Sequence, residues 1–110
     1  MSTTVFKGAI KAGSIDATFL SDASNADSDL LVISYAETGG GNPQVDQAVS
    51  APGGSASVGV NAPRKGVLEV WVATGPATDS GRLQVTRDGA MVDDEAIQGS
   101  IRWVYAVEAG

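Results

Sequence analysis

Apolar and polar residues alternate with a period of two along most of this chain, and this alternation is what most constrains its fold. Residues 15–19 place Ile15, Ala17 and Phe19 on one side of an extended segment, and residues 56–60 repeat the pattern. Such alternation is typical of strands that bury one face. Nowhere does an apolar stripe with helical spacing persist over the length of a helix. The chain is therefore expected to be all-β.

Turn signals separate these segments at regular intervals. Gly- and Pro-rich turns occur at 39–43, 52–54 and 75–76, and about eight short strands at such spacing favour a sandwich or a barrel. Segments such as 30–35 are apolar on both faces, which suits the central strands of packed sheets. We therefore expect a single antiparallel β-sandwich of immunoglobulin-like or jelly-roll type, with one domain over residues 1–110.

Three local details follow from the same pattern. The dipeptide Asp88–Gly89 predicts a two-residue hairpin turn of type I′, because both residues tolerate a positive φ. In the first strand, Phe6 and Ile10 are expected on the same side, since an even number of positions separates them. Trp103 shares a strand face with other large apolar residues and is expected in the core.

The chain lacks the side chains on which much enzyme and metal chemistry depends. It has no His and no Cys, which excludes imidazole bases, thiol nucleophiles, the Ser–His–Asp triad and the usual ligands of zinc, haem and iron–sulfur clusters. We expect no cofactor. The formal net charge of -6 argues against partners such as nucleic acid or an anionic membrane, whose phosphates would repel the protein.

An acidic loop after the second predicted strand is a candidate cation site. Asn25, Asp27 and Asp29 occupy alternate positions, a spacing that can bring oxygen ligands to calcium. An EF-hand is excluded, because Leu30 stands where that loop needs Gly and Ala36 where it needs a bidentate Glu. We therefore expect a solvated turn that binds calcium weakly or not at all.

The run Asp93–Asp94–Glu95 is a second acidic cluster. Glycoside hydrolysis needs two carboxyl groups that face one another across the scissile bond. Consecutive residues of an extended chain point to opposite faces, so this run does not form such a pair by itself. We expect the protein not to be an enzyme. A carboxylate-dependent hydrolase is the second of two alternatives to the function that we expect.

The strongest strand prediction is residues 67–73, where β-branched and aromatic residues dominate. One face, with Leu68, Val70 and Val72, is expected in the core. The other face carries Val67, Glu69, Trp71 and Ala73. An outward Trp can stack on a sugar ring, lie in a subunit interface, or be covered by a loop of its own chain. The sequence leaves these three alternatives open.

The apolar stripe of Val67, Trp71 and Ala73 favours the interface, since only 18% of the residues are charged. We therefore expect a non-catalytic binding or structural module that self-assembles as a homo-oligomer. The first alternative is a carbohydrate-binding, lectin-like module, with a glycan or a protein as the ligand. Residues 1–7 show no signal peptide, so a cytoplasmic or virion/particle-associated protein is expected rather than a classically secreted one.

Overall fold

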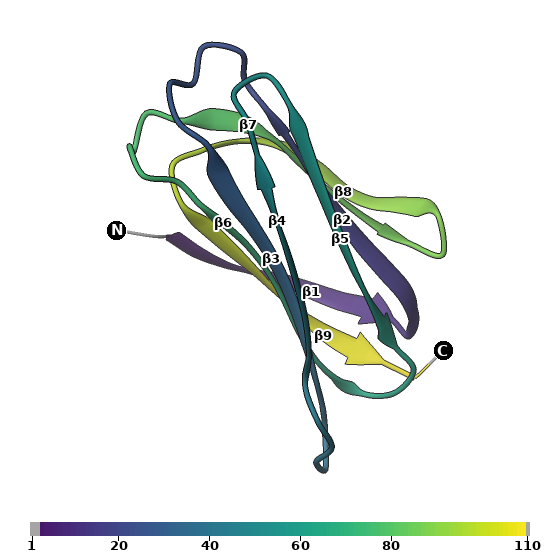
Figure 1. Cartoon of the computed structure of the whole chain (residues 1–110). Helices are drawn as coiled ribbons and strands as arrows, with labels where there is room; N and C mark the ends of the chain where they lie inside the picture. The colour runs from purple at the N-terminus through teal and green to yellow at the C-terminus, as the bar shows by residue number, and fades with distance from the viewer. Residues whose placement is uncertain (1–2, 110) are drawn as a thin grey trace.

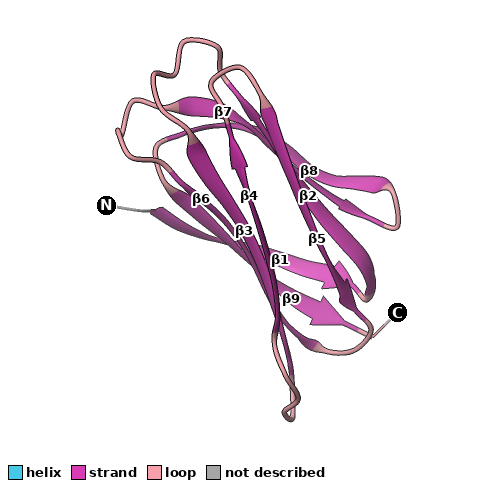
Figure 2. Cartoon of the chain, in the orientation of Figure 1, coloured by secondary structure: helices cyan, strands magenta, loops and turns pink. Residues whose placement is uncertain are grey.

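The computed structural model describes residues 3–109, which form strands joined by short loops (Figures 1 and 2). The expected domain 1–110 also includes Met1, Ser2 and Gly110, which lie outside the described residues. No helix in the described range is long and apolar enough to cross a membrane. The strands are β1 (Thr3–Lys11), β2 (Gly13–Ser21), β3 (Asp29–Glu37), β4 (Gln44–Ser50), β5 (Ser55–Ala62), β6 (Gly66–Ala73), β7 (Ser80–Arg87), β8 (Ala90–Gln98) and β9 (Ile101–Glu108).

The strands form two sheets that pack face to face, so the predicted all-β sandwich is confirmed. One sheet has five strands in the order β1-β9-β6-β3-β4, and the other has four in the order β5-β2-β7-β8. The described strand pairs are antiparallel except for β1 and β9, which run parallel. β6 is therefore the central strand of the five-stranded sheet, with β1 and β4 at its edges.

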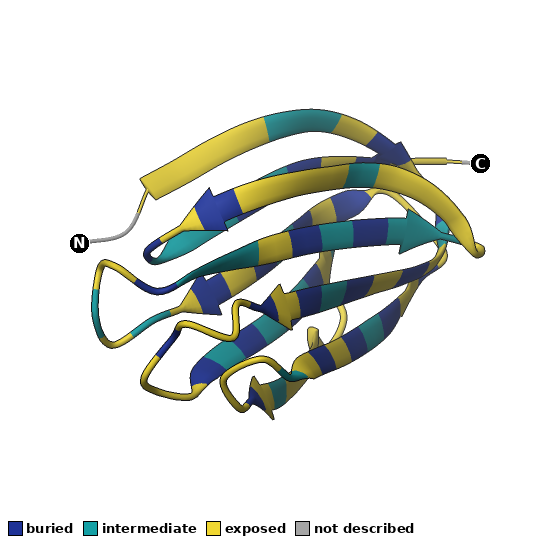
Figure 3. Ribbon diagram, turned by 90° about the horizontal axis from the view of Figure 1, so that it is seen from above, coloured by how far each residue is buried: buried dark blue, intermediate teal, exposed yellow. Residues whose placement is uncertain are grey.

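The core lies between the sheets and is built from every second residue of the strands, visible as alternating bands in Figure 3. In β6, the predicted core residues Leu68, Val70 and Val72 are buried, while their neighbours face outward. Trp103 is 2% exposed, as its strand face predicted. Fully burying a large apolar side chain contributes about 1.5–3 kcal/mol, so this shared layer holds the two sheets together.

β7 and β8 are joined by the predicted two-residue turn. Asp88 has a φ of 49° and Gly89 a φ of 83°, the two positive values that a type I′ turn requires. Arg87 and Ala90 pair on either side of the turn. The Asp88 N–H donates to the Ser14 carbonyl oxygen (2.8 Å), and the Ser14 N–H donates to Asp88 Oδ1 (2.8 Å). These bonds fasten the turn to β2.

The expectation for the first strand is wrong in one respect. Phe6 is 70% exposed, whereas Ile10 is 4% exposed. The register between β1 and β9 shifts between Phe6 and Gly8, which leaves Lys7 as the extra residue of a β-bulge. One extra residue reverses which side chains face the core, so Phe6 lies on the outer face and Ile10 on the inner face.

The two lateral openings between the sheets are closed by different chemistry. Next to β1 and β8, the Lys7 ammonium reaches across to Asp93 (Nζ to Oδ1, 3.3 Å) and to Glu95. Next to β4 and β5, the Gln44 side-chain amide donates to the Asn61 carbonyl (2.6 Å) and accepts from the Asn61 N–H (3.0 Å). Ion pairs of Lys7 thus join the sheets on one side, whereas on the other side Gln44 and Asp46, whose Oδ2 accepts from the Gly59 N–H (3.0 Å), bond to the backbone of β5.

Candidate functional site

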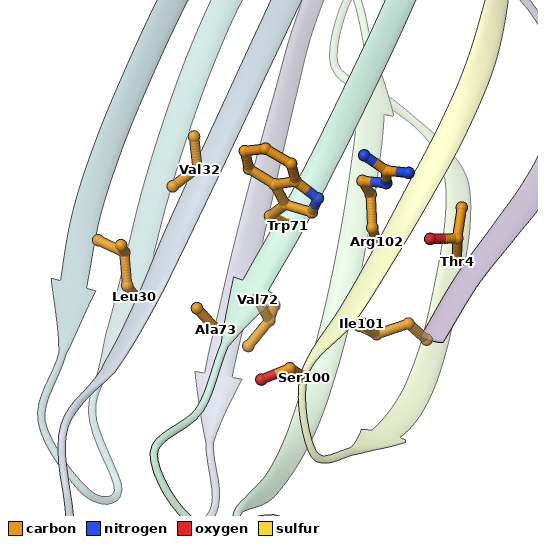
Figure 4. Close-up of a pocket in the computed structure, with 9 residues that line it drawn as sticks. All are labelled: Thr4, Leu30, Val32, Trp71, Val72, Ala73, Ser100, Ile101 and Arg102. Atoms are coloured by element: carbon orange, nitrogen blue, oxygen red, sulfur yellow. The ribbon is translucent and has the colours of Figure 1, made fainter. Parts of the chain in front are cut away.

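Trp71 lies in the middle of the outer face of the five-stranded sheet. The register places it beside Val32 of β3 and Arg102 of β9, and Figure 4 shows the indole between these two side chains. The side chain is 40% exposed. Because Val70 and Val72 on either side point into the core, the alternation of β6 forces Trp71 outward.

The charged groups next to the indole are paired with one another. Arg102 Nη1 lies 3.1 Å from Glu69 Oε1, and the Arg102 guanidinium carbon lies 5.7 Å from the centre of the Trp71 ring. An exposed ion pair contributes about 0–1 kcal/mol, and an exposed cation–π contact about 0.5–1 kcal/mol. Their main effect is to orient the indole and to leave the middle of the face without net charge.

A groove of about 490 Å³ lies beside the indole (Figure 4). Leu30, Val32 and Ala73 supply apolar walls, and Thr4 and Arg102 supply polar groups at the β1 side. The residues that line the groove lie in strands or directly before one. Within the described residues, a loop of the chain therefore does not cover Trp71, which leaves the sugar and interface alternatives.

The apolar surface extends beyond the groove to all five strands of this sheet. Its large exposed residues are Phe6, Val45, Val49, Val67 and Trp71. The register places half-buried apolar residues and alanines between them. The charged residues on this face are the central Glu69 and Arg102, and Lys11 and Glu108 at one end. The predicted site residues Val67, Glu69, Trp71 and Ala73 all lie on this surface, which we call the apolar face.

The outer face of the four-stranded sheet, which we call the polar face, has the opposite character. Thr18 Oγ1 and Ser57 Oγ are hydrogen-bonded at 3.0 Å, and Arg82 Nε lies 2.5 Å from Asp94 Oδ1. Leu20, at 41% exposed, and Met91, at 53% exposed, are large apolar residues here and lie on different strands, β2 and β8. The other outward residues include Ser14, Asp16, Ser55, Asn61, Gln84 and Gln98.

The acidic loop between β2 and β3 does not bring its three candidate ligands together. Asn25 is buried, and its Nδ2 donates to Ser21 Oγ (2.9 Å) and to the Ser80 carbonyl (2.8 Å). Its Oδ1 accepts from the Ser80 N–H (3.0 Å). Asp27 is exposed, whereas Asp29, the first residue of β3, is buried. Asn25 therefore ties the loop to β7, and its side chain points to Ser21 and Ser80.

Asp29 lies against a second buried carboxyl group, that of Asp79 in the β6–β7 loop. Asp29 is 1% exposed and Asp79 is 3% exposed. Within residues 3–109, both carboxyl oxygens of Asp29 and Oδ2 of Asp79 have no hydrogen-bond donor. Burial and the adjacent Asp79 carboxyl raise the pKa of Asp29 to about 7, and the charge of Asp27 adds to this effect.

The run Asp93–Glu95 divides between two faces, as the alternation predicted. Asp94 points outward and pairs with an arginine of β7. Asp93 and Glu95 point toward Lys7, and the Tyr105 hydroxyl donates to Asp93 Oδ2 (2.6 Å). Burial and this hydrogen bond raise the pKa of Tyr105. Burial lowers the pKa of Lys7, but its bonds to Glu95 and Asp93 raise it by more. These groups therefore serve to join the edges of β1 and β8.

Two parts of these sites have no signal in the sequence. Arg102 alternates with the buried Trp103 and so faces outward, but its position beside Trp71 depends on the register of β9 with β6. Asp79 meets Asp29 only because the β6–β7 loop lies against the start of β3 at one end of the sandwich. Strand pairing, which periodicity does not reveal, creates both contacts.

Among residues 3–109, no three side chains of the types His, Cys, Asp and Glu lie together as a metal ion would require. Comparison with protein-family models, with curated proteins and with solved structures gives no match for this chain. Its function therefore has to be inferred from its own geometry.

Proposed function

We propose that the protein is a non-catalytic structural module that self-associates through the apolar face. The observation that carries this proposal is the contrast between the two outer faces of one small sandwich. Large apolar side chains extend over all five strands of the apolar face, whereas Ser, Thr, Asn and paired charges cover most of the polar face. A contiguous apolar surface of this kind marks a contact site.

The apolar face is large enough for a stable contact. Five strands about 4.8 Å apart, with about eight residues each rising about 3.3 Å, span about 24 Å by 26 Å. A stable protein–protein interface buries about 800 Å² per partner, and protruding side chains add to the flat area of the sheet. The whole face is needed, so residues on the edge strands β1 and β4 are part of the interface.

The charge pattern of the apolar face fits a second copy of the same chain. Glu69 and Arg102 lie side by side at its centre. In a two-fold symmetric dimer, each contact occurs twice: if one residue of the first copy contacts another residue of the second copy, the same two residues also meet with the copies exchanged. The glutamate of each copy can then meet the arginine of the other, and no unpaired charge is buried.

Chromatography with light scattering tests the proposal. The wild type is expected to show an oligomeric mass, and Trp71→Glu to show the monomer mass with an unchanged fold, because the new carboxylate lies beside Glu69. Leu20→Glu is the matched control, since Leu20 is 41% exposed against 40% for Trp71 but lies on the polar face. A wild type that stays monomeric at millimolar concentration would contradict the proposal.

Carbohydrate binding is the second candidate, and the groove beside Trp71 is the observation that favours it. An exposed indole can stack on a sugar ring, and Thr4 and Arg102 could contact its hydroxyl groups. Arg102 is already engaged with Glu69 and with the indole, which weakens this candidate. Quenching of Trp fluorescence by a glycan library, absent in Trp71→Ala, would favour sugar binding over self-association.

A further inference from the structure

Asp29 and Asp79 connect the two sheets at the loop end of the sandwich. Asp29 begins β3 of the five-stranded sheet, and Asp79 directly precedes β7 of the four-stranded sheet. At 1% and 3% exposure, both residues are shielded from bulk solvent. Three of their four oxygens nonetheless have no donor among the described residues. Buried polar groups are rarely left without a partner, so these oxygens need a hydrogen-bond donor.

The surrounding charges do not supply that partner. The charged groups that act on Asp29 are Asp79, from the opposite sheet, and Asp27, from its own loop, and both are acidic. The ion pairs of residues 3–109 engage other carboxylates. If both carboxyl groups were ionised, two like charges would lie side by side away from water, which is strongly unfavourable.

We propose that Asp29 and Asp79 share one proton, in a hydrogen bond between a carboxylic acid and a carboxylate that joins the two sheets. The proton converts one acceptor into a donor and removes one of the two charges. It gives each carboxyl group one hydrogen-bond partner without any further residue and leaves one Asp29 oxygen without a donor among residues 3–109. On deprotonation the proton passes to water, and the two carboxylates repel one another.

This pair lies at a point on which several loops converge. The Asp79 carbonyl accepts from the Gly99 N–H (2.8 Å), in the turn before β9. The adjacent Ser80 holds the β2–β3 loop through both its N–H and its carbonyl, each bonded to Asn25. Repulsion between Asp29 and Asp79 would therefore loosen three loops together. Since the pKa of Asp29 is raised to about 7, this loosening is expected near neutral pH.

A pH titration of the wild-type protein, followed by the carboxyl carbon signals in NMR, tests the proposal. The Asp29 signal is expected to titrate with a midpoint of about 7 instead of 3.8. Hydrogen exchange at the Ser80 and Gly99 amides should accelerate over this range, beyond the normal effect of base catalysis. A midpoint near 4 for Asp29 would overturn the proposal.

Variants and calcium provide the controls. Asp29→Asn replaces the shared proton with an amide donor, so the pH-dependent change in hydrogen exchange should disappear. Asp27→Asn removes a nearby charge but keeps both Asp29 and Asp79. The titration midpoint of Asp29 should therefore fall slightly and stay well above 3.8. Calcium chloride at 1 mM should change neither the midpoint nor the melting temperature. If calcium stabilises the wild type but not Asp29→Asn, the pair is a metal site and the shared proton is disproved.

Discussion

The two outer faces of this sandwich are built on similar strands and meet the same solvent, yet they differ in composition. On the apolar face, Trp71 and Val67 are flanked by further valines and alanines, and Glu69 and Arg102 neutralise one another. On the polar face, hydroxyl pairs and ion pairs lie between the strands. Folding alone requires only one apolar face per sheet. The second apolar face of the five-stranded sheet is not needed for the fold and is the basis of the proposed self-association.

The strongest test of the contrast between the two faces places charged residues at opposite edges of the apolar face. A double change of Phe6→Asp on β1 and Val45→Asp on β4 should weaken self-association by about 5 kcal/mol, because it removes apolar contact and buries two charges. Sedimentation equilibrium measures the effect. Met91→Asp on β8 is the control, since Met91 is 53% exposed but lies in the other sheet. An unchanged dissociation constant for the double variant would restrict the interface to the surroundings of Trp71.

The contrast between the two outer faces is sharpened by a test that changes the stability of the fold through Asp29 and leaves both faces unaltered. The folded-state pKa of Asp29 is about 7, above its ordinary value of 3.8. The folded protein therefore binds more protons than the unfolded chain between these values. The stabilisation is complete below pH 3.8 and is lost as the pH rises through 7. Denaturant unfolding should show a loss of about 3 kcal/mol between pH 5 and pH 8 from this pair.

Asp29→Asn should remove most of that loss and be more stable than the wild type at pH 8. The matched control is Asp16→Asn, an exposed acid on the polar face, which should retain the wild-type pH dependence. Equal slopes for the wild type and Asp29→Asn would mean that the pH dependence arises from other groups.

A change in the turn between β7 and β8 should affect folding and leave association intact. Gly89→Val places a β-branched residue at a φ of 83°, where such side chains are strained. It should destabilise the domain by about 1–3 kcal/mol. Thermal unfolding measures this loss, and an unchanged melting temperature would show that the turn relaxes to another type. The oligomeric mass below the melting temperature should stay that of the wild type.

The smallest expected effect concerns the charges at the centre of the apolar face. Glu69→Arg and Arg102→Glu should each weaken self-association by about 1–2 kcal/mol through repulsion of like charges. An equimolar mixture of the two variants should form heterodimers, because each supplies the charge that the other lacks. Native mass spectrometry counts the species. A statistical mixture from a protein that does dimerise would show that the charges do not meet across the interface.

The parts of the molecule that could be predicted from sequence are those set by neighbours in the chain. The alternation in residues 67–73 was enough to separate Val70 from Trp71, and Asp88–Gly89 was enough to predict the hairpin. The bulge at Lys7 was not visible, because an extra residue in one strand is recognised only against its partner. The partnership of Asp29 with Asp79 was missed for a related reason, since it depends on how two sheets stack.

The parallel pairing of β1 with β9 has a consequence for the order in which the described sheet is completed during synthesis. Thr3 lies beside Ile101, and Lys11 beside Glu108, so β1, which is synthesised before the other described strands, pairs with β9, which is synthesised after them. Until then, β1 has no partner in its sheet, and Phe6 extends from an unpaired strand. Unpaired strands of nascent chains readily pair with the wrong neighbour. The bulge and the charge of Lys7 in the middle of β1 make such pairing less favourable while the strand waits for β9.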